Sequence, residues 1–133
     1  MSAAATPMTT AEMVDLITDY ALDPKALDVV VLDLSGASAF TDAFVIATGR
    51  SDRQVKAIHD AIYQGMKNKH GMLANHVEGL AEGNWVLLDY GDVVVHVFTP
   101  ATREYYRLET LWGDVPRRTV SGGEGEAPPE PAA

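Results

Sequence analysis

The chain has 133 residues, of which 47% are hydrophobic and 22% are charged, and this length and apolar fraction are typical of one domain with its own core. Nineteen Asp and Glu residues against ten Lys and Arg residues give a formal net charge of −9, which disfavours direct binding to nucleic acid or anionic membranes. The absence of cysteine excludes disulfides, thiolate nucleophiles and Cys-ligated metals. No apolar run reaches the roughly 18 residues that span a bilayer, and the first seven residues do not form a secretory signal. We therefore expect a cytoplasmic protein.

The first half of the chain contains one helix pattern and two strand patterns after a flexible N-terminus at residues 1–8. Thr9 and Glu12 form a capping-box pattern that begins the helix, and Pro24 ends it because proline disfavours helical geometry in the preceding residue. Residues 29–32 and 43–48 are continuous apolar runs, which is typical of strands that are covered on both faces.

The second half predicts an amphipathic helix over residues 52–69, with Ser51 and Gln54 in a second capping-box pattern and Gly71 as its C-terminal cap. Strands are predicted near residues 75–78, 85–88 and 93–98, with a hairpin turn at Tyr90-Gly91. A last helix over residues 100–111 can cover the sheet with four apolar side chains: Ala101, Tyr105, Leu108 and Leu111. This order predicts an α/β fold: a single domain with a mixed β-sheet and helices packed on it.

The composition changes near Pro116. Residues 116–133 are rich in Gly, Pro and Glu, and this stretch cannot bury enough surface to offset its ordering entropy. We expect a disordered tail there and a folded domain at residues 9–115. The tail holds two Arg and three Glu, so −8 of the net charge of −9 belongs to the rest of the chain.

Three of the four histidines have no strong functional pattern. His59 and Asp60 lie on the predicted helix over residues 52–69, where a solvated helix face explains them. His70, His76 and Glu78 surround a loop and can be spaced to hold a metal, but they form neither an HxH nor an HxxxH pair. No metal site is predicted.

The fourth histidine, His96, lies on a predicted strand. Period-2 alternation places it on one strand face with Asp92, Val94 and Phe98. Both a hydrogen-bonded structural role and an acid–base role are open for this residue.

The turn Thr48-Gly49-Arg50-Ser51 leads from a strand into a helix N-terminus, a position that attracts anions. It lacks the glycine spacing of a Walker loop or a dinucleotide fingerprint. With Asp42, this turn defines the alternative function, a cryptic nucleotide-binding or nucleotidyltransferase enzyme. The sequence has no GxSxG elbow and no carboxylate spacing typical of a two-metal site, so neither catalytic residues nor a cofactor are predicted.

A candidate protein-binding surface lies around the predicted hairpin. Trp85, Leu87 and Asp89 share one side of a strand that ends in Tyr90-Gly91-Asp92. Aromatic side chains beside carboxylates are typical of a binding patch with a charged rim, and a core position for Trp85 fits the same pattern. The net charge of −9 favours a basic protein as the partner.

These residues resemble the ribosomal silencing factor (Iojap-like) family. The similarity covers about residues 8–114 and rests on motifs in the family's order and spacing: LDLS at 32–35, TDAFVIATGRSDRQV at 41–55, EG at 78–79, WVLLDYGDVVVHVF at 85–98 and REYYRLETLWGD at 103–114.

The resemblance implies a mixed-sheet domain with nucleotidyltransferase-like topology but without catalytic residues. It also implies a non-enzymatic, cofactor-free function: binding to ribosomal protein uL14 on the large subunit, which blocks joining of the small subunit and represses translation under nutrient limitation. Homodimers occur in the family. The residues implied for uL14 contact are Trp85, Asp89, Tyr90 and Asp92 around the hairpin, with Tyr106, Glu109 and Trp112 as secondary candidates.

Overall fold

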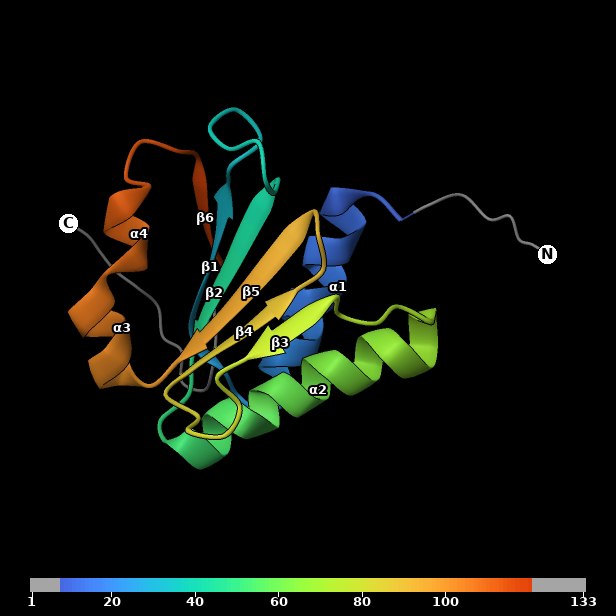
Figure 1. The fold of residues 1–133 in the computed structure, drawn as a ribbon, viewed down its shortest axis with the longest axis vertical. Helices are drawn as coiled ribbons and strands as arrows, with labels where there is room; N and C mark the ends of the chain where they lie inside the picture. The colour runs from blue at the N-terminus through green and yellow to red at the C-terminus, as the bar shows by residue number, and fades with distance from the viewer. Residues whose placement is uncertain (1–7, 121–133) are drawn as a thin grey trace.

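A computed structural model describes residues 8–120, and within them a single six-stranded sheet carries helices on both faces (Figure 1). The elements in chain order are α1 (Thr10–Leu22), β1 (Leu27–Asp33), β2 (Ala43–Thr48), α2 (Asp52–His70), β3 (His76–Glu78), β4 (Trp85–Asp89), β5 (Val93–Phe98), α3 (Pro100–Tyr106), α4 (Leu108–Leu111) and β6 (Arg117–Val120).

The sheet is mixed, as predicted. Its strand order is β3-β4-β5-β2-β1-β6. β2 and β5 run parallel, while the β1–β2, β1–β6, β3–β4 and β4–β5 pairs run antiparallel. The parallel pair in the middle of the sheet is joined by α2 and the β3–β4 hairpin, so chain segments far apart in sequence meet at the centre.

Two apolar layers lie on opposite faces of the sheet, because successive side chains of a strand alternate between its faces. On β1, Val29 and Val31 join the cluster under α1 and α2, whereas Val30 and Leu32 join a smaller cluster on the other face. The prediction of strands covered on both faces is confirmed for β1. Figure 1 shows α1 and α2 together at the right of and below the strands, and α3 and α4 apart from them at the left.

The predicted helix ends are confirmed in the structure. Thr9 and Glu12 form the full capping box at the start of α1, and Gly71 closes α2 with a φ of 66°. Ser51 accepts the amide of Gln54 as expected, but the Gln54 side chain accepts the amide of Arg50 at 2.6 Å instead of returning to Ser51.

The predicted helix over residues 100–111 is wrong as one continuous element. Arg107 adopts a φ of 49°, which ends α3, and the short α4 begins after it. A left-handed residue redirects the chain, so the four apolar residues expected on one helix face no longer share it. Ala101, Tyr105 and Leu111 are exposed, and of the four only Leu108 packs against the sheet.

The predicted disordered tail over residues 116–133 is wrong for its first part. Residues Arg117–Val120 form β6, which pairs with β1 as an edge strand. The pairing satisfies backbone groups of β1 that would otherwise form the sheet edge, and Val120 packs against the main core. The folded domain thus extends past residue 115. The flexible N-terminus expected at residues 1–8 and the rest of the tail at 121–133 lie outside the described part of the chain, except for Met8, which is partly buried and packs against the main core.

Candidate functional site

Trp85 occupies the centre of an aromatic cluster on the face of the sheet that α1 and α2 leave open. Its ring centroid lies 4.9 Å from that of Phe98 on β5 and 4.8 Å from that of Tyr106 on α3. Trp85 is half-buried and Tyr106 is exposed. The two interpretations of Trp85, core and surface, are therefore both partly correct: one side of the ring packs on the sheet and part of it faces solvent.

His96 is buried beside Trp85 and is joined to its indole by a hydrogen bond. The Trp85 Nε1–H donates to Nδ1 of His96 at 3.1 Å. An indole nitrogen can only donate, so Nδ1 acts as the acceptor and the imidazole is neutral with its proton on Nε2. Burial lowers the pKa of His96 to about 4, which agrees with this neutral form. The geometry favours the structural role for His96 over acid–base catalysis.

Phe44 extends the cluster toward the end of α4. Its ring meets His96 edge-on at 4.5 Å and Trp112 at 5.9 Å. Trp112 is half-buried, like Phe44. We call this cluster the aromatic face: the half-buried or exposed rings of Phe44, Trp85, Tyr106 and Trp112 lie over the buried rings of His96 and Phe98.

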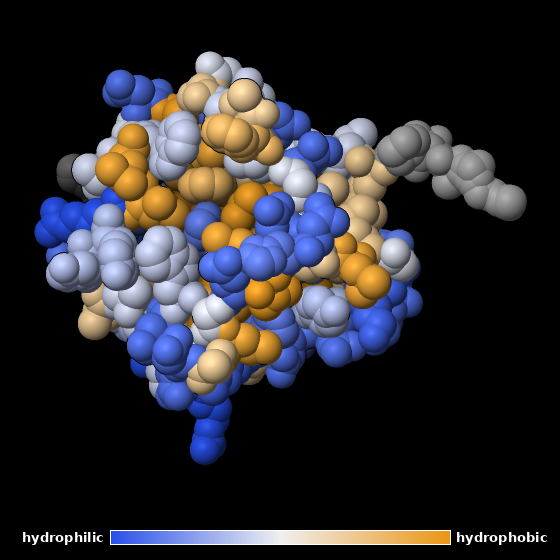
Figure 2. Space-filling model, viewed as in Figure 1, coloured by the Kyte–Doolittle hydropathy of each residue, from blue (hydrophilic) through white to orange (hydrophobic). Residues whose placement is uncertain are grey.

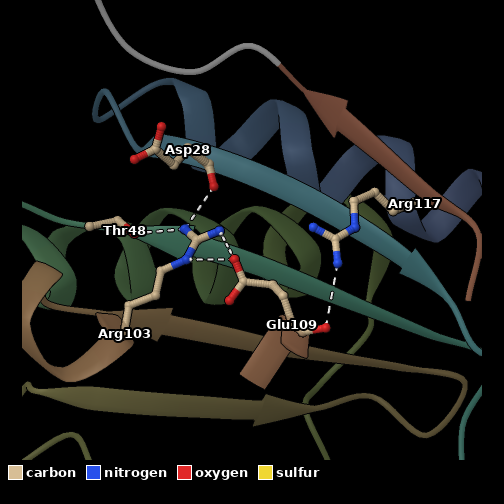
Figure 3. A network of polar contacts seen from close by, with 5 residues as sticks. All are labelled: Asp28, Thr48, Arg103, Glu109 and Arg117. Carbon is tan, nitrogen blue, oxygen red and sulfur yellow. Dashed lines mark hydrogen bonds and ion pairs between the residues drawn. The ribbon is translucent and has the colours of Figure 1, made fainter. Parts of the chain in front are cut away.

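Glu109 does not face outward as a contact residue but closes an internal polar network (Figure 3). Its Oε2 accepts from Nε and Nη2 of Arg103 at 3.0 and 2.6 Å. Nη1 of Arg103 donates to the Thr48 hydroxyl and to the Asp28 carbonyl, each at 2.7 Å. Burial opposes ionisation of Glu109, but the hydrogen bond and charge of Arg103 outweigh it and lower the pKa of the carboxyl. Glu109 therefore holds the segment after β5 onto β1 and β2.

The hairpin between β4 and β5 carries the predicted aspartates in two different settings. Asp89 Oδ1 accepts the amide of Gly91 at 2.8 Å, and Gly91 has a φ of 90°, so Asp89 shapes the turn. Asp92 is exposed, while its carbonyl accepts the amides of Asp42 and Ala43 at 2.9 and 3.1 Å. The predicted turn is confirmed.

Tyr90 is badly placed for the predicted contact role. Its side chain belongs to the core under α1 and α2, only 8% of the residue is exposed, and its hydroxyl has no hydrogen-bond partner among the described residues. Burial, with a smaller contribution from Tyr63, raises its pKa to about 12. The chain turns between Asp89 and Gly91, so Tyr90 points away from the aromatic face.

The structure therefore brings together three of the predicted residues, Trp85, Tyr106 and Trp112, on the aromatic face. Asp89 shares the Trp85 side of β4 by alternation, and Asp92 stands at the hairpin tip of the same sheet. Sequence analysis missed Phe44 and Arg103. Arg103 and Glu109 are six residues apart, which is not a neighbour spacing on a continuous helix, so only the break at Arg107 makes their pairing possible.

The residues of the alternative nucleotide site are not brought together. Asp42 precedes β2 and the turn at residues 48–51 follows it, and a six-residue strand separates its ends by about 20 Å. The Thr48 hydroxyl accepts from Arg103, and Ser51 caps α2. These contacts explain the turn without a phosphate.

The other polar clusters offer no metal site within residues 8–120. In this part of the chain, no group of three His, Cys, Asp or Glu side chains is placed to hold an ion. Nε2 of His70 lies 2.9 Å from the Tyr20 hydroxyl, whereas His76 pairs with Glu78. Among the described helices, none is long and apolar enough to cross a membrane.

Comparison with known proteins gives one consistent family. The family model described as "Ribosomal silencing factor during starvation" matches residues 7–133. The protein named ribosomal silencing factor RsfS from Bacillus subtilis is 47% identical over 101 residues, which is 76% of this chain and 85% of that protein. The protein of the same name from Halalkalibacterium halodurans is 40% identical over 115 residues, 86% of this chain and 97% of that protein.

A more distant relative and two solved structures agree with this match. The mouse protein named mitochondrial assembly of ribosomal large subunit protein 1 is 31% identical over 102 residues, 74% of this chain and 44% of that protein. A crystal structure from Chromobacterium violaceum, 40% identical, has a TM-score of 0.77 over 80% of this chain and 88% of its own. Another from Bacillus halodurans, 39% identical, has a TM-score of 0.71 over 84% and 98%.

Proposed function

This chain belongs to the ribosomal silencing factor family, and from that premise we propose that it binds ribosomal protein uL14 on the large ribosomal subunit. In this proposal the bound protein occupies the surface that the small subunit must approach, so subunit joining stops and translation falls under nutrient limitation. The role is steric and needs neither a catalytic residue nor a cofactor. The names of the relatives, which refer to ribosome silencing and to large-subunit assembly, support a large-subunit partner.

The observation that carries the proposal is the aromatic face with aspartates at its end. A half-buried Trp85 packed against an exposed Tyr106 presents rigid aromatic area, which is the usual composition of a binding hot spot. Asp92 adds an exposed carboxylate near this face, and the chain carries a net charge of −9. Such a surface suits a basic ribosomal protein and is a poor match for RNA phosphates.

Of the seven residues that the sequence suggests for contact, the geometry supports five as contact residues: Trp85, Asp89, Tyr106, Trp112 and Asp92. Tyr90 belongs to the core, and Glu109 acts through Arg103. We therefore reassign these two from contact to support of the fold.

The test is a binding measurement with purified uL14 and with isolated large subunits. Trp85→Ala is expected to weaken binding about thirtyfold, because loss of a hot-spot side chain costs about 2 kcal/mol. Asp92→Lys reverses a charge at the rim of the surface, so it is expected to weaken binding by a larger factor at low salt than at high salt. An unchanged dissociation constant for both folded variants would contradict the assignment of the surface. In a subunit-joining assay, the wild-type protein should lower the amount of joined subunits and Trp85→Ala should restore it.

A further inference from the structure

The loop at residues 34–42, between β1 and β2, carries an aromatic side chain that is almost fully exposed to solvent. Phe40 is 94% exposed, more than any other large hydrophobic residue in the described part of the chain. No ring contact accounts for its position among residues 8–120, unlike the aromatic residues around Trp85. A phenylalanine held almost wholly in water contributes nothing to the core, and exposed apolar side chains indicate a contact surface where they are grouped, as here with the exposed Leu111, which lines a groove together with Ala37 of this loop.

The backbone of this loop is ordered by hydrogen bonds. The Leu34 amide donates to the Asp42 carbonyl at 2.8 Å, which closes the loop at its base, and Leu34 itself is fully buried. The Leu34 carbonyl accepts the amides of Ala37 and Ser38 at 2.9 Å. The Ser38 hydroxyl accepts the amide of Phe40 at 3.0 Å. The ring is thus presented from a defined backbone, which reduces the entropy lost when a partner contacts it.

The loop lies between two parts of the proposed binding surface. On one side, Ala37 lines a groove of about 320 Å³ with Leu111, Trp112 and Val115 from the end of α4 and the turn after it. On the other side, the Asp42 amide donates to the carbonyl of Asp92 at the hairpin. Figure 1 shows this loop at the top of the molecule between the α4–β6 connection and the start of β5, and Figure 2 shows hydrophobic residues, among polar ones, at this end.

We propose that the 34–42 loop is a further contact surface for the basic ribosomal protein that binds the aromatic face, with Phe40 inserted into an apolar pocket of that partner. This inference rests on the proposed function. Carboxylates outnumber cations around the loop and match a basic partner: Asp33 and Asp42 at its two ends, Asp92 beside it and Asp114 in the adjoining groove, against Arg117 and Arg118 in the hollow next to Asp33. Exposed Leu111 on the wall of that groove extends the apolar area toward Trp112.

The test compares Phe40→Ser with the matched control Leu73→Ser in binding to purified uL14 and to isolated large subunits. Leu73 is also an exposed large hydrophobic residue, but it lies between α2 and β3, an edge strand that β4 and β5 separate from β2 and β1. Phe40→Ser is expected to weaken binding at least tenfold, whereas Leu73→Ser stays within twofold of the wild type. Both variants should keep the wild-type melting temperature, because neither side chain is buried. A Phe40→Ser dissociation constant within twofold of the wild type would overturn the inference.

Two further measurements separate this inference from its premise. If Trp85→Ala weakens uL14 binding and Phe40→Ser does not, the loop proposal fails while the proposed function stands. If the wild-type protein does not bind uL14 at all, the proposed function itself fails. Sedimentation of the free protein tests whether a second copy of this chain, and not uL14, contacts the loop. If the wild-type protein is a dimer, and Phe40→Ser makes it a monomer without changing uL14 binding, then Phe40 belongs to a contact between copies and the proposal is overturned.

Discussion

The two faces of the sheet are built in different ways. On one face, α1 and α2 each bury five residues against the strands, including the fully buried Ile17, Ile58 and Ile62. On the other face, α3 and α4 bury none of their residues. We call residues 100–115, which include these two helices, the arm. The arm is held by ring contacts to Trp85 and Phe44 and by the Arg103–Glu109 network.

This difference indicates that one face mainly provides stability and the other mainly provides the binding surface. Close-packed apolar burial supplies most of the stability of a domain, so the α1–α2 face, which holds the larger buried cluster, carries most of the free energy of folding. A face covered by a lightly packed arm keeps aromatic side chains half-exposed and available to a partner. Substitutions of buried residues on the first face should therefore change stability without changing the affinity of the folded protein, whereas substitutions of the half-exposed aromatic residues on the second face should change affinity more than stability.

The largest expected effect is on the α1–α2 face. Ile62→Ala should lower the free energy of unfolding by about 3–4 kcal/mol, because it removes a fully buried side chain and leaves a cavity. Urea unfolding measures this loss, with Ala57→Ser on the exposed side of the same helix as the control. Binding to uL14, corrected for the folded fraction, should not change. A changed affinity of the folded variant would break the proposed division between the faces.

The next effect concerns the pH dependence of stability and comes from His96. Its folded-state pKa is lowered from 6.5 to about 4, so the unfolded chain binds the proton more tightly. The stabilisation is complete above pH 6.5 and is lost as the pH falls toward 4, by about 3 kcal/mol over the whole window. Unfolding curves between pH 7 and pH 5 measure this slope. The pKa of Glu109 is also lowered, and the stabilisation from this carboxylate is lost only at pH values more acidic than this range.

His96→Asn is the control for this pH effect. Asparagine keeps an acceptor near the position of Nδ1 but does not titrate. The variant should lose the pH dependence between pH 7 and pH 5 even though its stability at pH 7 is lower. A slope equal to that of the wild type would show that another group causes it.

A smaller effect is expected from the polar network of the arm. Arg103→Ala should destabilise the protein by about 2 kcal/mol, because it leaves the Glu109 carboxylate partly buried without its partner. It should also weaken uL14 binding, because Tyr106 and Trp112 lie on the arm that Arg103 holds. The matched control is Glu104→Ala, which breaks the exposed pair between Arg107 and Glu104 and should change stability by less than about 0.5 kcal/mol. Equal effects of the two variants would contradict the role of the network.

The α1–α2 face was also the part of the fold that the sequence predicts well. The capping box at Thr9, the cap at Gly71 and the apolar stripe of α2 are local signals, and the structure confirms each of them. The hairpin at Gly91 and the alternation that puts His96 on the Trp85 side are likewise set by neighbouring residues. In these elements the local residue preferences and the tertiary packing favour the same structure, so the local pattern is enough to predict them.

The arm and β6 were predicted less well because their structure depends on distant contacts. The helical spacing of Leu108 and Leu111 continues that of α3, and nothing near Arg107 indicates a left-handed residue. Arg103 reaches Asp28 and Thr48, which are 75 and 55 residues away in the chain. β6 is polar in composition and becomes a strand by pairing with β1. The burial of Tyr90 follows from the turn direction, which the presence of Gly91 alone does not specify.

The smallest expected effect on stability lies within the aromatic face and concerns the hydrogen bond between Trp85 and His96. Trp85→Phe removes the donor but keeps a ring between Phe98 and Tyr106, so it should cost about 1 kcal/mol of stability. If the bond orients Trp85 for docking, His96→Leu should weaken uL14 binding in the wild-type background but not in the Trp85→Phe background, since it then has no indole to orient. The four dissociation constants form a double-mutant cycle. Equal fold-changes in both backgrounds would mean that His96 supports only the fold. A coupling free energy between the two residues would instead show that the hydrogen bond from Trp85 to His96 holds the indole in the orientation that binds uL14.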